Sequence, residues 1–201
     1  MTGGIASASA YVQINGGAEY TNTTQVSVAY SPNGWEDYYS ISNSLNMYNA
    51  AWSPIPSVRT VAWVLPYTQG PRTVYMEFTY EPDKYDPGSV WGVSAGSDTI
   101  ILDTQSPTCK VSSYTVRRYA TARLVTSCYD YASQKVSLTL KIKTLGGAVK
   151  KTLQSGWVYD GTYRWTYSRV SLRKGTYRVE MTGVDQAGNA SGVGRASLYV
   201  R

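Results

Sequence analysis

Gly175-Thr-Tyr-Arg-Val-Glu-Met-Thr-Gly-Val-Asp-Gln-Ala-Gly-Asn189 is the stretch of this chain that decides its fold class. The apolar side chains of Tyr177, Val179 and Met181 alternate with polar ones, which is the period of two of a β-strand with one buried face. Residues rich in Gly, Asp and Asn follow directly and predict a turn. The stretch therefore predicts a strand that ends in a tight turn.

The same alternation occurs in other parts of the chain. Apolar residues occupy every second position over 136–142 and aromatic ones over 163–167, and no segment of ten residues has helical spacing. Turn residues separate these runs at Asn15-Gly16-Gly17, Pro32-Asn33-Gly34, Gly146-Gly147 and Asp160-Gly161. Short strands between frequent turns predict an all-β fold built of sandwiches.

The two halves of the chain also repeat one another. Residues 73–79, TVYMEFT, align with residues 176–182, TYRVEMT, and each is followed by a loop and a final strand, at 98–103 and 195–200. Two copies of a penultimate and a last strand indicate two modules. We therefore predict two tandem Ig-like β-sandwich domains, 1–104 and 105–201, joined by a short segment that ends in Pro107.

Charge divides the chain at the same place. Residues 1–104 hold 3 Lys and Arg against 9 Asp and Glu, a net charge of −6, whereas residues 105–201 hold 16 against 4, a net charge of +12. The overall charge of +6 hides this division. A chain polarised in this way is typical of a protein that binds or assembles.

Several segments resemble Ig-like repeats of large bacterial surface and secreted proteins. In the first half these are 39–43, 61–65, 73–78 and 98–104, in which the strand TVYMEF and the terminal DTIILDT are similar to the repeats. In the second half, residues 175–189 resemble the end of related Ig-like or fibronectin-type-III-like modules. The resemblance implies a β-sandwich fold and a spacer, adhesin, enzyme appendage or phage structural part. The first half departs from the family at 80–88, where YEPDKYDPG replaces the expected DAAGN.

Catalysis is not expected from this composition. The chain has no histidine, the usual general acid or base near neutral pH. The nearest pair of carboxylates is Asp83 and Asp86, beside prolines in what the sequence indicates is an exposed turn. No run of residues is long and apolar enough to cross a bilayer, and Met1-Thr2-Gly3-Gly4 does not begin a visible secretion signal. An extracellular, cell-surface or virion location therefore assumes a mature or excised piece, or release by lysis.

Cys109 and Cys128 have the clearest local chemistry. A hairpin centred between Arg118 and Tyr119 places them directly opposite each other, which favours a disulfide between the first two strands of the second module. In the chain-entropy model such a loop stabilises by roughly 3 kcal/mol, and it implies an oxidising compartment. The alternative is a pair of buried free thiols, which behave as small apolar residues.

The loop Asp185-Gln-Ala-Gly-Asn189 offers oxygen atoms at two positions. Asp185 and Asn189 are therefore candidate ligands for Ca²⁺, together with Asp103 or Asp130. Calcium takes six or more oxygens, and so few donors in a basic module favour the alternative interpretation. In that interpretation the two side chains fix the turn and Gly188 adopts positive φ, and no cofactor is expected.

Two sets of side chains are candidates for binding. Aromatic rings near turns could stack on a sugar, and they are Trp35, Trp52 and Trp91. Cations that could share one face and contact a polyanion are Lys141, Lys143, Lys150, Lys151, Arg164, Arg169, Arg173 and Lys174. Without a stacking motif, nucleic acid is the less favoured ligand of such a face. Buried aromatic residues and a solvated basic surface are the alternatives.

The sequence thus favours a non-catalytic structural or adhesive protein. In its specific form, the acidic first module docks on the basic second module of a neighbouring copy, which would produce a homo-oligomer, a ring or a filament. A second hypothesis is an accessory binding module whose basic half holds a glycan or another polyanion. A plain spacer, in which the two halves face solvent independently, is the third.

Overall fold

The computed structural model describes residues 9–83, 86–87 and 94–201. The chain forms two compact units, Met1–Asp103 and Thr104–Arg201, which we call the first and the second unit. Their boundary lies one residue before the expected one. The described residues contain strands and no helix, so none of them forms a helix that could span a membrane.

The first unit consists of two sheets. One has the order β1-β3-β6 and the other β2-β8-β7-β4-β5. The strands are β1 (Tyr11–Ile14), β2 (Tyr20–Thr21), β3 (Gln25–Ser31), β4 (Tyr38–Ser42), β5 (Ser53–Pro54), β6 (Thr60–Val64), β7 (Gly70–Thr79) and β8 (Ser94–Leu102).

The second unit repeats this plan. Its sheets have the orders β9-β11-β14 and β10-β16-β15-β12-β13. The strands are β9 (Thr108–Val111), β10 (Tyr114–Val116), β11 (Ala122–Tyr129), β12 (Lys135–Lys143), β13 (Val149–Tyr159), β14 (Gly161–Tyr167), β15 (Gly175–Asp185) and β16 (Gly194–Val200).

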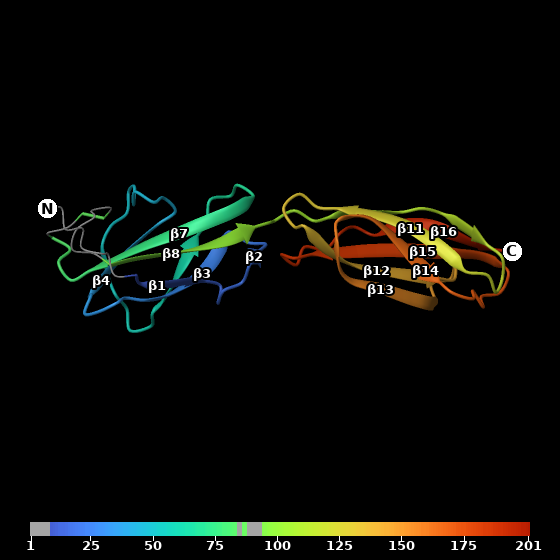
Figure 1. Ribbon diagram of the computed structural model, residues 1–201, viewed down its shortest axis with the longest axis horizontal. Helices are drawn as coiled ribbons and strands as arrows, with labels where there is room; N and C mark the ends of the chain where they lie inside the picture. Colours follow the sequence, from blue (N-terminus) through green and yellow to red (C-terminus); the bar gives the residue numbers. More distant parts are fainter. Residues whose placement is uncertain (1–8, 84–85, 88–93) are drawn as a thin grey trace, which may run out of the picture. The chain divides into compact units, whose positions relative to one another are not determined.

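The two units share one strand order, position by position. In each unit the second strand pairs in parallel with the last, β2 with β8 and β10 with β16, while the other ladders are antiparallel. The aligned segments 73–79 and 176–182 lie in β7 and β15, the penultimate strands, so the predicted repeat is confirmed. Figure 1 shows β7 beside β8 in the first unit and β12 near β15 in the second.

Each unit buries its own core between its two sheets. In the first unit Ile14 and Val28 of one sheet and Val74, Met76 and Phe78 of the other are buried together. In the second unit the core is made by Leu124 and Trp165 from one sheet and by the inward residues of β12, β15 and β16 from the other. The alternation that predicted the strands thus separates core residues from surface residues.

The fifth strand position differs between the units. In the first unit β5 has 2 residues and pairs only with the start of β4, whereas β13 has 11 residues and follows β12 along most of its length. The ladder between β12 and β13 has irregularities at Ser137/Thr139 and Ile142/Lys143. The second unit therefore presents a longer five-stranded face.

Candidate functional site

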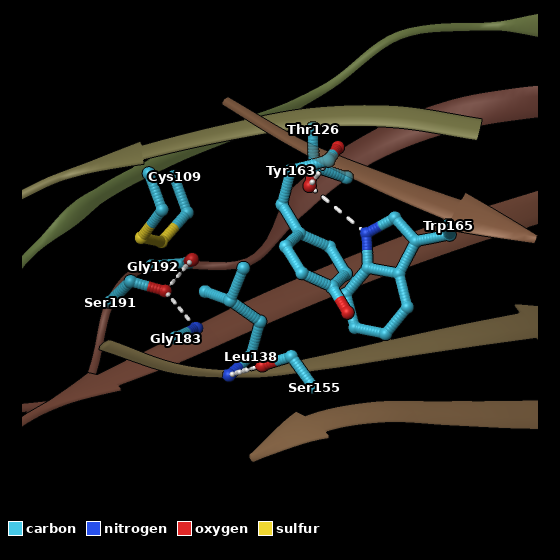
Figure 2. The surroundings of a disulfide bond; sticks show 10 residues. Cys109, Thr126, Leu138, Ser155, Tyr163, Trp165, Gly183, Ser191 and Gly192 are labelled. Atoms are coloured by element: carbon cyan, nitrogen blue, oxygen red, sulfur yellow. Dashed lines mark hydrogen bonds between the residues drawn. A yellow bond between two sulfur atoms is a disulfide. The ribbon is translucent and has the colours of Figure 1, made fainter. Parts of the chain in front are cut away.

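A disulfide joins Cys109 and Cys128 in the second unit. The two residues are direct partners in the ladder between β9 and β11, as the spacing predicted. The expected hairpin of the first two strands is wrong, because β10 lies between β9 and β11 in the chain and pairs with β16 in the other sheet. Gly183 of β15, in the opposite sheet, faces the disulfide (Figure 2), and a Cβ atom there would lie 2.7 and 2.9 Å from the two sulfur atoms. Glycine at this position is what lets the disulfide fit between the sheets.

A buried hydrogen bond lies near the disulfide in the same core. The indole Nε1 of Trp165 donates to Oγ1 of Thr126 at 3.0 Å, and the ring of Tyr163 packs edge-on against the indole at 4.8 Å between centroids. Figure 2 shows these three side chains together. A buried tryptophan requires such a partner, so this ring serves the core and is not a binding surface.

The loop 185–189 is a hydrogen-bonded turn. The backbone N–H of Asn189 donates to Oδ1 of Asp185 at 2.8 Å, and its side-chain Nδ2 donates to Oδ2 at 2.9 Å. Gly188 has φ of 92°. These contacts agree with the turn interpretation. Asp130 places a carboxylate oxygen within 4.8 Å of one from Asp185, and the less favoured hypothesis of Ca²⁺ binding stays untested.

An ion-pair cluster lies on the outward face of the five-stranded sheet of the second unit. The Nζ of Lys143 donates to Oε2 of Glu180, and the guanidinium groups of Arg178 and Arg195 lie 3.7 and 3.9 Å from Oε1. The hydrogen bond from Lys143 holds the pKa of Glu180 below its ordinary value. Arg178 and Arg195 were not among the candidate residues predicted from the sequence. Their alternation with core residues along β15 and β16 was the signal that could have placed them on the outward face.

The candidate cations do not all share one face, which corrects that expectation. Lys141 and Lys143 lie on the five-stranded sheet, whereas Arg164 lies on β14 of the other sheet. Lys150 lies on β13 with Lys151, whose Nζ is 5.7 Å from the ring centroid of Tyr167. Arg169, Arg173 and Lys174 lie in the loop between β14 and β15. The chain passes from one sheet to the other between β13 and β14 and again between β14 and β15, which the sequence spacing does not show.

The three candidate tryptophans have different surroundings. The side chain of Trp35, in the loop between β3 and β4, is 94% exposed. Trp52 is half-buried. Trp91 lies outside the described residues. Among the described members of this set, Trp35 is therefore the ring that is open to a partner.

The cavities of the first unit are shallow and lie beside the segment 43–52. One of about 370 Å³ is lined by Leu45, Met47, Tyr75 and Glu77, among others. Another, of about 330 Å³, lies between β4 and β6 and includes Tyr39 and Trp63.

Comparisons with known proteins were made for sequence and for fold. No protein-family model matches the chain, and no curated protein has a matching sequence. Among solved structures, the fibronectin(III)-like modules of CbhA from Clostridium thermocellum are 10% identical with a TM-score of 0.48, covering 95% of this chain and 94% of theirs. The I9–I11 tandem from titin is 11% identical with a TM-score of 0.33, covering 91% of this chain and 61% of the tandem.

These likenesses are too distant to assign a function. The strand order of the units themselves decides the fold. Both units are Ig-like β-sandwiches. Each Ig-like unit has a three-stranded and a five-stranded sheet, and the resemblance seen in the sequence is confirmed at the level of fold.

Proposed function

We propose that this tandem is a non-catalytic structural or adhesive protein of an extracellular, cell-surface or virion setting, and that its copies associate head to tail. The observation that carries the proposal is the opposite charge of the two units, −6 in the first and +12 in the second. Each unit has a hydrophobic core of its own.

A contact between unlike units has a structural consequence. It uses two different surfaces of each copy, so every copy keeps one of each kind free and the contact propagates into a ring or a filament. Opposite potentials speed the encounter and set its direction, while affinity requires apolar surface as well. Exposed aromatic rings such as Trp35 supply that surface.

Three observations support the non-catalytic part and the setting. The chain has no histidine, and the carboxylates of Asp83 and Asp86 are exposed in a loop. Polar groups that act as acid and base need a protected site with shifted pKa values. The disulfide between Cys109 and Cys128 is compatible with an oxidising compartment outside the cytosol.

Light scattering at several protein concentrations tests the proposal. We expect the mass to rise with concentration at low ionic strength and to fall toward that of the monomer, 22.1 kDa, in high salt. Salt has this effect because the screening length is about 8 Å at physiological ionic strength and shorter above it. A monomer at every salt and protein concentration would reject self-association.

The second candidate function is binding of a polyanionic glycan by the second unit. The exposed cations Lys141 and Arg195 on the five-stranded face favour it. Changing both residues to glutamate separates glycan binding from self-association. If the variant no longer binds a sulfated polysaccharide but still associates with itself as the wild type does, the result supports glycan binding by this face.

A further inference from the structure

One end of the first unit concentrates acidic side chains from two loops. The loop between β3 and β4 approaches the segment after β7, since the N–H of Asp37 donates to the carbonyl of Thr79 at 3.2 Å. The hydroxyl of Ser94, at the start of β8, donates to Oε1 of Glu36 at 2.6 Å. We call this the acidic end, and its carboxylates belong to Glu36, Asp37, Glu81, Asp83 and Asp86.

The acidic end also carries exposed aromatic rings. Trp35 is 94% exposed and Tyr80 is 61% exposed. Arg59 reaches the same end, because its carbonyl accepts from the N–H of Tyr30. Among the described residues of this end, carboxylates outnumber cations. An exposed ring within a charged rim has the composition of a binding hot spot.

One end of the second unit concentrates cations. β10 and β16 finish side by side, with Val116 opposite Val200, and β15 begins opposite Val200 at Gly175. The N–H of Arg118 donates to the carbonyl of Arg201 at 2.8 Å. We call this the basic end, and its exposed cations are Arg117, Arg118, Arg169, Arg173, Lys174 and Arg201.

The basic end has no acidic residue to neutralise it. The structure describes the second unit throughout, and Asp130, Asp160 and Asp185 belong to turns at the opposite end of its strands. Glu180 lies within β15, where it pairs with Lys143. The cations of the basic end therefore face solvent with their full charge.

The turns of the basic end are fixed by backbone hydrogen bonds. The N–H of Tyr119 donates to the carbonyl of Val170 at 2.7 Å, and that of Val170 donates to Ala120 at 2.9 Å. Tyr119 and Arg169 have φ of 68° and 50°, left-handed values that are costly for such residues. The guanidinium of Arg118 lies 4.6 Å from the ring centroid of Tyr119, which is 55% exposed. The surface is thus held in one conformation before a partner arrives.

Each charged end lies away from the point where the chain passes to the other unit. In the first unit β8 begins at the acidic end with Ser94 and runs to Leu102, after which the unit finishes. In the second unit β16 finishes at the basic end with Val200. Both ends therefore lie at chain positions remote from the junction at Asp103 and Thr104.

We propose that the acidic end of one copy docks on the basic end of the next, with Trp35 as the apolar anchor. This inference rests on the proposed function and names its surfaces. The partner is a second copy of this chain, because the carboxylates and the cations are complementary and each end lacks its counterpart on its own unit. Trp35 would stack on arginine or tyrosine side chains of the basic end, where Arg118 and Tyr119 already form such a pair.

Charge reversal at each end, followed by mixing, tests this contact in the full chain. One variant carries Asp37→Lys, Asp83→Lys and Asp86→Lys, and the other carries Arg117→Glu, Arg118→Glu and Arg173→Glu. We expect each variant alone to remain a monomer. The first variant then has two positively charged ends, and the basic end of the second variant keeps three cations against three new carboxylates, so that it no longer attracts the acidic end. An equimolar mixture should associate again, because the unchanged basic end of the first variant meets the unchanged acidic end of the second.

Matched variants distinguish the ends from the rest of the surface. Trp35→Ala should weaken association by about 10- to 30-fold and leave the melting temperature unchanged, since the side chain is exposed. The paired reversal Lys141→Glu and Arg195→Glu, on the sheet face, should weaken it far less than reversal at the basic end. A mixture that stays monomeric, or equal effects of the two sets of reversals, would overturn the end-to-end contact. A wild-type chain that never associates would instead reject the proposed function itself.

Discussion

Single residues decide how closely the two sheets of the second unit can pack. Gly183 is the clearest case, because the disulfide of β9 and β11 occupies the space that a larger residue would fill. The hydroxyl of Thr126 plays a comparable part by accepting from the buried indole of Trp165. Protein interiors are close-packed, so a change of one methyl group at such a position has a measurable cost.

Gly183→Ala is expected to destabilise the second unit by about 1–3 kcal/mol. The added Cβ would lie 2.7 Å from Sγ of Cys109 and 3.2 Å from Cδ2 of Leu138, and the disulfide and the backbone allow little movement. Urea unfolding followed by fluorescence would measure the loss.

Gly192→Ala is the matched control for that change. No atom lies within 4 Å of a Cβ atom built at Gly192, so this variant should unfold close to the wild type. If Gly183→Ala unfolds at the same urea concentration as Gly192→Ala, glycine is not required opposite the disulfide.

At the scale of elements, β12, β15 and β16 are linked across their outward face by Glu180. Its carboxylate has Lys143 from β12, Arg178 from its own strand and Arg195 from β16 around it. Its pKa is lowered chiefly by the hydrogen bond from Lys143. A carboxyl whose pKa is lower in the folded state stabilises the fold above its ordinary pKa, about 4.3, and loses this effect as the pH falls through the folded-state pKa.

Glu180→Gln should lower stability at pH 7 by about 1 kcal/mol or less. It should also flatten the acid side of the stability profile, so that the two melting curves converge as the pH approaches 3. Thermal melting between pH 7 and pH 3 measures both effects. Lys143→Met should flatten the profile in part, because it removes the hydrogen-bond donor to Glu180. Parallel stability profiles for the wild type and Glu180→Gln would contradict a lowered pKa of Glu180 in the folded state.

For the whole molecule, the two cores form independent sources of stability. Each hydrophobic cluster contains residues of one unit alone. The disulfide closes a loop of 19 residues within the second unit. By restricting the unfolded chain within this loop, the disulfide therefore stabilises the second unit and not the first.

Reduction of the disulfide should lower one of two calorimetric transitions and leave the other in place. The expected loss is about 3 kcal/mol, which shifts the melting temperature of a unit of this size by at least about 10 °C. The double variant Cys109→Ser and Cys128→Ser should match the reduced protein and be insensitive to reductant. Movement of both transitions together would show that the units unfold as one.

Much of the fold could be predicted from local pattern. Alternation over 136–142 and 176–182 assigns strands and their buried faces, because side chains of a strand point alternately to its two sides. Equal spacing about Arg118 and Tyr119 placed Cys109 opposite Cys128. Both inferences need only the geometry of one strand or one pair of strands.

The sequence by itself therefore determined the opposite charge of the two halves and predicted several strands, their inward faces and the opposition of the two cysteines. The tertiary structure alone decided which distant residues are neighbours. Asp37 meets Thr79, and Arg118 meets Arg201, because the strand order places the ends of non-consecutive strands together. Periodicity tells which side of a strand is buried, but the order of strands depends on how two whole sheets pack, and only that order gathers charges from separate loops into one surface.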